Sequence, residues 1–459
     1  MCIRDRLTLD ATPYFFFVHS TPNGGTTLSE NGSFLGNEPA GPLNLPFSQN
    51  GIVTAESQSL YTEYNQGLNS YLTWHRGHNS IRLGYWYSYF DYHQATSFAL
   101  ANLQGQVASS YGDYPIRTAS GAVLRTYDAH LLQQTNAIYA DDTLKLLDDK
   151  LTLNAGFKAV SIYRTSTDAV PGPTYKTGAS NFEPLPQLSA SYFATPHDQV
   201  YADVATAFSE PGAAYFDIFS VANGRYSLQH NPALRPEFSI SEEVGYRHSG
   251  LVNVSVAFFN FNLTNKQVSS TQIVSGTPTA LYINAGGQTS RGVDAEIGLR
   301  PWHYFSPYIS GQYLRSKIDN NLQSGADYLP TKGKTSVLSP EFSGAVGLNY
   351  DNGTFFGNFT MNYVDSQYST FVNDQSIPSY LTANAALGYR LHNIAFFKKP
   401  QIQINFVNIG DENYISGAFG VTGNAQATRG LFGTTIAGSA PTYWIGAGFA
   451  TYVSLSSAF

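Results

Sequence analysis

Apolar and polar residues alternate along many segments of this 459-residue chain. In one of them, Ile402, Ile404 and Phe406 alternate with glutamine and asparagine. The same period of two recurs at residues 151–159, 293–299, 342–350 and 381–389. A two-residue period is the pattern of a β-strand with one apolar and one polar face. The chain is therefore predicted to be all-β, with Ile402, Ile404 and Phe406 on one face of their strand.

The connections between these segments are short and long in turn. Short turns are expected at residues 76–79, 146–150, 195–198, 248–250, 301–304, 351–353 and 391–400. Long polar connections are expected at residues 20–57, 94–129, 166–182, 209–236, 266–289, 318–339, 367–378 and 410–443. Counting the segments between them gives roughly 16 antiparallel strands. A soluble domain rarely carries so many long loops on one side, whereas outer-membrane barrels combine short periplasmic turns with long extracellular loops.

Composition supports a membrane-spanning barrel. Charged residues make up 12% of the chain, against about 25% in ordinary globular domains, while aromatic residues reach 14%. The chain has no run of apolar residues long enough for a transmembrane helix, which needs about 20. Strands that alternate lipid-facing and lumen-facing residues explain the low charge, the high aromatic content and the lack of a long apolar run. We therefore expect a transmembrane antiparallel β-barrel in contact with outer-membrane lipid. The net charge of −7 gives no basic surface for nucleic acid.

The first six residues, MCIRDR, do not fit a barrel protein. They lack the apolar region and the cleavage site of a secretory signal. We therefore expect residues 1–6 to be a non-native start and residues 7–459 to form one barrel domain. Cys2 is the single cysteine, so no intrachain disulfide is expected.

Two segments depart from regular alternation. Asp141 and Asp142 are consecutive, so one of them must face lipid or lie near the membrane interface. The phase of the pattern changes at Phe258 and Phe259, which predicts a β-bulge there.

Candidate chemical groups are dispersed. Six of the ten histidines lie in or beside different short turns, namely His75, His78, His197, His248, His303 and His392, so no metal site is expected. Asp411 and Glu412 lack the spacing of a calcium loop, and Asp294 and Glu296 have no nucleophile and base beside them. We expect neither an enzyme nor a bound cofactor.

Several segments resemble one known family. The segment 401–417, QIQINFVNIGDENYISG, is similar to a late strand of TonB-dependent outer-membrane receptors, written N-N-L-F-D-K-x-Y. The segment around Phe208 and Pro211 resembles the family's F-R-A-P segment, with Ser209 and Glu210 in place of Arg-Ala. Further matches are TSRGVDAEIGLRP and the N-P-x-L-x-P-E and E-x-G-x-R residues Asn231, Pro232, Leu234, Pro236, Glu237, Glu243, Gly245 and Arg247. The terminal strand, which ends at Phe459, resembles the assembly signal of outer-membrane barrels, although an accidental apolar end has the same pattern.

The resemblance implies a barrel of 22 strands closed around an N-terminal plug in the outer membrane of a Gram-negative bacterium. It also implies that outer loops bind a ligand, which is imported with energy relayed by TonB. Because we find only roughly 16 strands and no plug in the sequence, we expect a C-terminal fragment of a longer receptor, whose contact with TonB involves the missing plug region.

Three functions remain open at this point. The first is active uptake of a scarce extracellular solute, most often a ferric siderophore. The second is a passive diffusion porin with a complete barrel of roughly 16 strands, and the third is a soluble β-rich binding protein. Tyr368 and Tyr414 are candidate ligand contacts, since tyrosine offers an apolar face and a polar tip. His230 lies between the F-R-A-P-like and N-P-x-L-like segments, where haem receptors of the family carry a histidine, so haem is a further candidate ligand.

Overall fold

The computed structural model describes residues 6–35, 38–170, 175–211, 217–222, 225–230, 234–274, 277–394 and 397–458. Strands, turns and irregular segments make up these residues, and no helix among them is long and apolar enough to cross a membrane. Residues 1–5 lie outside the described ranges, so the expectation of a non-native start stays a prediction.

Seventeen strands form one large antiparallel sheet. They are β1 (Leu7–Ser20), β2 (Asn23–Ser29), β5 (Ile52–Arg76), β6 (Asn79–Leu100), β7 (Arg125–Leu146), β8 (Leu151–Asp168), β9 (Tyr175–Phe193), β10 (Asp198–Ser209), β13 (Glu237–His248), β14 (Val252–Thr264), β17 (Gln288–Leu299), β18 (Phe305–Ile318), β21 (Phe342–Asp351), β22 (Phe355–Val364), β25 (Tyr380–Arg390), β26 (Lys398–Val407) and β31 (Ala450–Ala458).

Small two-stranded hairpins decorate this sheet. They pair β3 (Phe34–Leu35) with β4 (Glu38–Pro39), β11 (Asp217–Ala222) with β12 (Arg225–His230), β15 (Gln267–Val274) with β16 (Thr277–Asn284), β19 (Leu322–Ser324) with β20 (Asp327–Leu329), β23 (Gln367–Tyr368) with β24 (Ser376–Ile377), β27 (Ile415–Gly420) with β30 (Thr442–Ile445), and β28 (Thr428–Arg429) with β29 (Thr435–Ile436).

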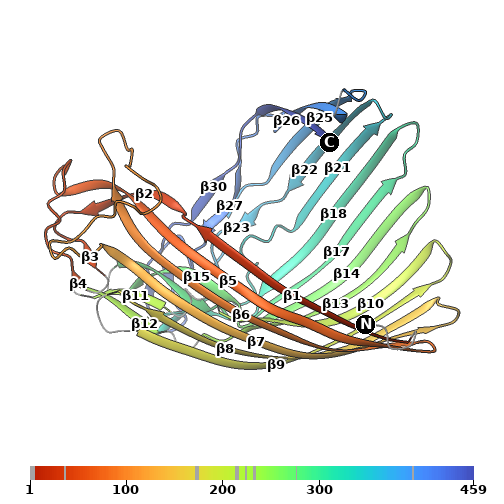
Figure 1. The fold of residues 1–459 in the computed structure, drawn as a ribbon, viewed down its shortest axis with the longest axis horizontal. Coiled ribbons are helices and arrows are strands. Elements are labelled where there is room, and N and C mark those ends of the chain that lie inside the picture. Colours follow the sequence, from red (N-terminus) through yellow and green to blue (C-terminus); the bar gives the residue numbers. More distant parts are fainter. Residues whose placement is uncertain are drawn as a thin grey trace.

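The large sheet is a meander. Both β1 and β2 pair with β5, along successive segments of it, so they fill one place in the sheet. From β5 to β31 each strand pairs with the next one of the sheet in chain order. The seventeen strands thus occupy sixteen places, which agrees with the number expected from the sequence. In the described residues no ladder joins β1 to β31, and the sheet is a strongly curved trough (Figure 1).

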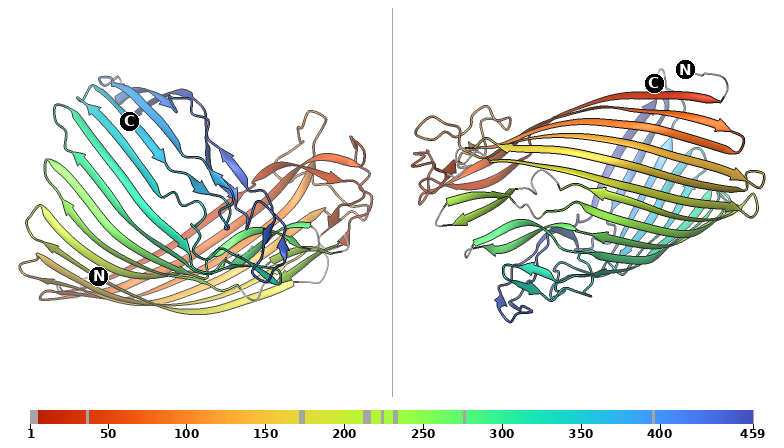
Figure 2. Two further views of the ribbon diagram at one scale, coloured as in Figure 1. Left: turned by 180° about the vertical axis from the view of Figure 1, so that it is seen from behind. Right: turned by 90° about the horizontal axis from the view of Figure 1, so that it is seen from below.

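The two ends of the trough differ as the connection lengths predict. Short turns join the strands at one end, and the small hairpins gather at the other (Figures 1 and 2). Gly77 and Gly353 take positive φ angles of 59° and 89° in two of the short turns, a conformation that glycine adopts without steric cost. The sequence therefore predicted correctly which end carries turns and which carries elaborated loops.

The first strands are longer than expected. β5 has 25 residues and β6 and β7 have 22 each, whereas about 9–11 residues suffice to cross a bilayer in a barrel. Their far ends therefore extend beyond the hydrocarbon layer, where part of their surface packs against loops and the apolar-polar alternation fades. For this reason the connection expected at 94–129 is in fact only 101–124.

The outward face of the sheet is apolar, as predicted. Ile404 is 39% exposed on this face, whereas its neighbour Asn405 points into the trough and is 9% exposed. Asp142 lies on the same face of β7 as the exposed Ile138, near the short-turn end, and Asn79 Nδ2 donates a hydrogen bond of 2.6 Å to its Oδ2. Asp141 faces the inside of the trough. Asp142 is thus the aspartate on the outward face, the face that is expected to meet lipid, and this part of the expectation is confirmed.

The bulge expected at Phe258 and Phe259 is absent from the described ladders. β14 keeps a continuous register with both β13 and β17. Phe258 points outward and is exposed, and Asn260 follows it on the same face, where Arg291 Nε donates to Asn260 Oδ1 at 2.8 Å. The prediction of a bulge was therefore wrong. The alternation changes phase because the outward face of β14 changes from apolar to polar where the strand leaves the membrane.

Candidate functional site

A cavity of about 970 Å³ lies on the concave face of β6 to β10. Alternate residues of these strands point into it, and the residues between them, such as Leu83, Ile138 and Tyr163, are exposed on the outer face. The lining combines aromatic, cationic and acidic side chains, among them Arg82, Trp86, Gln133, Tyr139, Asp141, Lys158, Arg164, Gln187, Phe208 and Glu210. The volume falls within the range of about 300 to 1,000 Å³ that is usual for small-molecule sites.

The departure of β10 from β9 shapes one wall of the cavity. The ladder between these strands ends at the pair of Gln187 and Ala205, although β10 continues to pair with β13 as far as Ser209. Pro184 and Pro186 follow on the β10-facing edge of β9, and proline has no N–H to donate to a ladder. Past Ala205 the backbone ladder between β10 and β9 is replaced by a side-chain hydrogen bond from the Thr206 hydroxyl to the Pro186 carbonyl at 2.9 Å, which leaves the end of β10 room to turn into the trough.

Phe208, at this free end, packs against a small apolar cluster on the concave face. The buried members of the cluster are Ala137, Val160 and Ile162, and Trp86 and Leu185 pack against them. Phe208 is one of the two residues that match the F-R-A-P-like segment. Phe208 is partly buried in this contact, which holds the end of β10 in the cavity wall.

The cationic residues of the cavity are held in fixed positions. The Lys158 ammonium lies 4.9 Å from the centre of the Trp86 ring, and the Arg82 guanidinium lies 4.8 Å from that of Tyr71. Such cation–π contacts stabilise a cation without neutralising it. Arg164, which is 7% exposed, donates to Gln133 Oε1 from Nε at 2.9 Å and from Nη2 at 2.5 Å.

Glu210 lies beside Arg164 at the outer end of the cavity. Asn181 Nδ2 donates to Glu210 Oε2 at 2.9 Å. Burial raises the pKa of the Glu210 carboxyl, although the Asn181 hydrogen bond and the charge of Arg164 act in the opposite direction. Three cations therefore face two carboxylates, of Asp141 and Glu210, so the cavity suits a ligand that carries negative charge and aromatic surface.

Two packed clusters of apolar side chains lie among the loops at the outer end of the trough. The first, which we call the N-terminal loop core, consists of Leu43, Ala55, Phe98, Ile116 and Leu124. The second, the C-terminal loop core, consists of Ala285, Ile318, Leu322, Leu329, Val337, Phe371 and Val372. Each joins loops that are far apart in the sequence, so these outer loops are packed structures rather than independent connections.

Two carboxylates reinforce the C-terminal loop core. Asp327, which is 2% exposed, accepts hydrogen bonds from the N–H groups of Phe432 and Thr434 at 2.8 and 3.1 Å and from the Thr434 hydroxyl at 2.5 Å. Burial acts to raise its pKa, but these bonds and that from the Tyr328 N–H outweigh it and hold the pKa at about 2. Asp374 similarly accepts the N–H groups of Ala425 and Gln426.

The residues singled out from the sequence lie at separate places around the loops. Tyr368 belongs to the β23–β24 hairpin, and its carbonyl accepts the N–H of Leu338 at 2.9 Å. The ring of Tyr414 contacts that of Tyr380, with centroids 4.5 Å apart. In the part of the chain that the structure describes, no hydrogen bond or ring contact joins Tyr368 to Tyr414. His230 ends β12, and its side chain lies outside the described part, so all three ligand contacts stay predictions.

The segment that follows β26 forms a strand-to-loop boundary. Asn408 Oδ1 accepts the N–H of Glu412 at 3.0 Å, and Asp411 Oδ1 accepts the N–H of Phe449 at 2.9 Å. These side chains therefore hold the foot of the last long loop.

Sequence reasoning missed the cavity itself. Arg164 and Glu210 are 46 positions apart, Arg164 on β8 and Glu210 at the start of a long connection, and single-strand alternation assigns Arg164 to the inner face without indicating its partner. The one local signal was the pair of prolines in β9, which marks where the ladder must end.

Comparison with known proteins gives a consistent result. The family model described as TonB dependent receptor-like, beta-barrel matches residues 4–409. Similar solved structures include the ferric yersiniabactin uptake receptor FyuA from Yersinia pestis (16% identity, TM-score 0.64, 98% of this chain and 58% of that one) and the siderophore receptor PiuA from Acinetobacter baumannii (15%, 0.64, 99% and 62%). The copper transporter OprC is also similar (13%, 0.65, 98% and 62%). The chain thus spans about three-fifths of the length of these structures.

Proposed function

Because the chain belongs to the TonB-dependent receptor-like β-barrel family, a family of outer-membrane transporters of Gram-negative bacteria and not of enzymes, we propose that it forms the wall of a receptor that imports a ferric siderophore. In this proposal the energy for import is relayed by TonB. Two similar structures, FyuA and PiuA, are described as receptors for ferric yersiniabactin and for a siderophore, which supports this choice of ligand.

The observation that carries the proposal is the mixed cationic and aromatic lining of the concave cavity. Lys158, Arg82 and Arg164 supply positive charge, and Trp86 and Tyr139 supply ring surface. Ferric chelates that bind iron through carboxylate or catecholate oxygens carry negative charge and often aromatic rings. Such a ligand gains from both parts of the lining. Uptake then requires binding followed by a change of conformation, with no covalent chemistry.

Uptake of radioactive iron tests the proposal. Iron-starved cells that carry the full receptor should accumulate an anionic ferric siderophore only when TonB is present. Lys158→Gln should raise the half-saturating concentration about tenfold, since a hydrogen bond to a charged group is lost. Lys150→Gln removes the same charge from a short turn outside the cavity and should leave uptake unchanged.

The passive porin suggested by the strand number gives the opposite result. Uptake through a porin continues without TonB and does not saturate at low concentration. Equal accumulation in cells with and without TonB would therefore exclude the receptor and favour the porin. Heat-modifiable migration in detergent should be the same for both variants, which shows that any lost uptake is not a loss of folding.

A further inference from the structure

A second cavity lies on the opposite, lipid-facing side of the sheet. It has a volume of about 680 Å³ and lies over β21, β22, β25 and β26. Gly357 and Ala385 form its floor, and large side chains such as Phe359, Leu387 and Ile404 surround them. In the ladder Gly357 pairs with Leu387 and Ala385 with Phe359, so two small residues lie diagonally between bulky neighbours. The result is a depression in an otherwise apolar wall.

Aromatic residues locate the depression within the bilayer. The rings of Phe355 and Tyr389 are 5.0 Å apart at its short-turn end, and those of Phe305 and Tyr350 are 4.8 Å apart beside it. Trp302 is exposed in the adjacent short turn. Girdles of aromatic residues mark the two membrane–water interfaces of such barrels. The depression therefore opens into the leaflet next to the short turns, which is the periplasmic leaflet.

Positive charge lies just outside this aromatic girdle. Lys398 and Lys399 are exposed and precede the lining residue Ile402 by three or four positions at the start of β26, where a β-bulge interrupts the ladder with β31 before Gln401. Residues 391–400 contain no aspartate or glutamate. Asp351, in the neighbouring turn, already forms a bidentate ion pair with Arg390 at 2.7 and 2.9 Å. The two lysines thus favour an anion at the level of lipid headgroups.

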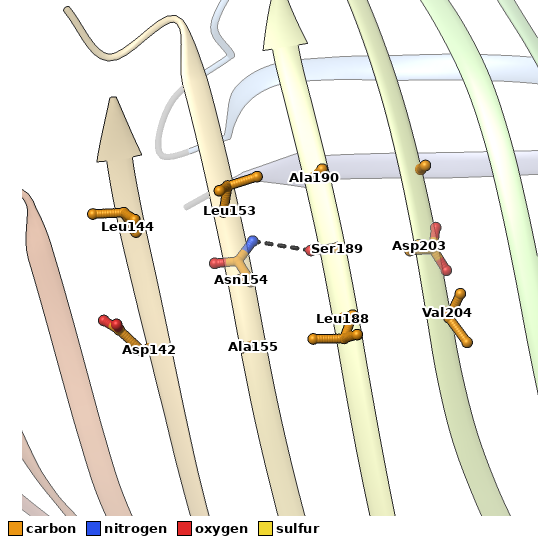
Figure 3. A pocket seen from close by; sticks show the side chains of 11 residues that line it. Asp142, Leu144, Leu153, Asn154, Ala155, Leu188, Ser189, Ala190, Asp203 and Val204 are labelled. Carbon is orange, nitrogen blue, oxygen red and sulfur yellow. Dashed lines mark hydrogen bonds between the residues drawn. The ribbon is translucent and has the colours of Figure 1, made fainter. Parts of the chain in front are cut away.

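Another lipid-facing depression provides a contrast. It has a volume of about 520 Å³ and lies over β7 to β10, with Leu144, Ala190 and Val204 among its lining residues (Figure 3). Asp142 lies at its edge, and the adjacent turn carries Asp148 and Asp149 together with Lys150. Residues 391–400, beside the depression on β21 to β26, therefore carry lysines and no carboxylate side chain, whereas the turn beside the depression in Figure 3 carries both.

We propose that the depression on β21 to β26 binds a glycerophospholipid with an anionic headgroup from the periplasmic leaflet. One acyl chain lies over Gly357 and Ala385 between the aromatic side chains. The phosphate interacts with Lys398 and Lys399. Neither the family match nor the proposed uptake function assigns such a site.

Native mass spectrometry of the whole chain, refolded in detergent, tests the site. The probes are phosphatidylglycerol and phosphatidylethanolamine with identical acyl chains. We expect one phosphatidylglycerol to be retained in preference to phosphatidylethanolamine. Lys398→Gln combined with Lys399→Gln should weaken phosphatidylglycerol retention about thirtyfold, the ratio expected for the loss of two lysines at a membrane surface.

A second pair of variants tests the depression itself. Ala385→Trp fills it and should reduce retention of phosphatidylglycerol to the background, whereas Ala190→Trp fills the depression of Figure 3 and should leave retention unchanged. Equal retention of the two lipids by the unmodified protein would overturn the proposal, as would full retention by Ala385→Trp. If Ala385→Trp does not fold, as judged by heat-modifiable migration, the exposed lysine pair decides the question alone.

Discussion

At the residue scale, neighbouring positions on one strand have opposite surroundings. Ile404 meets lipid on the outer face, whereas Gln403 and Asn405 point into the trough, where Gln403 Nε2 donates to Asn405 Oδ1 at 2.6 Å. The effect of a substitution therefore depends on which face of the sheet the residue occupies, so two adjacent positions can respond in opposite ways.

Ile404→Lys should impair assembly in the membrane. A lysine on the lipid face near the bilayer midplane costs about 2 to 4 kcal/mol. Gln403→Lys places the same charge on the inner face and should fold nearly normally. The fraction of heat-modifiable protein after refolding measures both. Similar losses for the two variants would contradict the assignment of faces.

The sequence predicted these faces because alternation is a local property. It could not predict which inner residues are buried. Asn405, which alternation places simply on the lumen side, is in fact packed against β31, where its Nδ2 donates to Ser454 Oγ at 3.3 Å. For the same reason the sequence pointed to exposed tyrosines in loops as ligand contacts and missed Arg164, whose position depends on packing between strands.

At the scale of elements, the long outer loops are joined to one another. Asp327 in the β19–β20 hairpin accepts hydrogen bonds from the loop that contains Phe432 and Thr434, more than a hundred residues away. Alternation contains no information about contacts between loops. The sequence therefore predicted where the long polar connections lie and how long they are, but not that they pack together. The loop cores could be found only from the structure.

Acid should release this contact. The pKa of Asp327 in the folded chain, about 2, is below the ordinary value of about 3.9. The carboxylate therefore stabilises the contact fully above about pH 4, and the stabilisation is lost as the pH falls through about 2. Hydrogen exchange at the Phe432 and Thr434 amides, corrected for its intrinsic pH dependence, should accelerate over that range.

Asp327→Asn provides the control for the effect of acid. Its amide does not titrate, so exchange at the same two amides should already be faster at neutral pH and should change little on acidification. A pH response in this variant equal to that of the unmodified chain would assign the effect to another group.

At the scale of the whole molecule, the trough has long, packed loops at one end and short turns at the other. Short-long alternation of the connections predicted this polarity, the antiparallel meander and the sixteen places. Its curvature and the length of the first strands were not predicted, because they depend on sheet twist and on strand segments outside the membrane, where alternation fades.

Cysteine labelling in cells measures the orientation. In a Cys2→Ser background, Ala119→Cys lies in a long outer connection and should react with a membrane-impermeant maleimide on intact cells. His392→Cys lies in a short turn and should react only after the outer membrane is permeabilised. Reaction of His392→Cys on intact cells would reverse the assigned orientation.

The early end of the β9–β10 ladder has a mechanical consequence. Where a ladder is continuous, as between β8 and β9, hydrogen bonds join the neighbouring strands along their length, and changing the angle between them would break several bonds at once. Beyond Ala205 no backbone ladder joins β9 to β10 in the described residues. Two side-chain bonds remain, from the Thr206 hydroxyl to the Pro186 carbonyl and from Asn181 to Glu210, so fewer bonds oppose a change of angle there than along a continuous ladder. Part of the lining next to Glu210 can thus yield to a ligand of slightly different size while the ladders on either side stay intact.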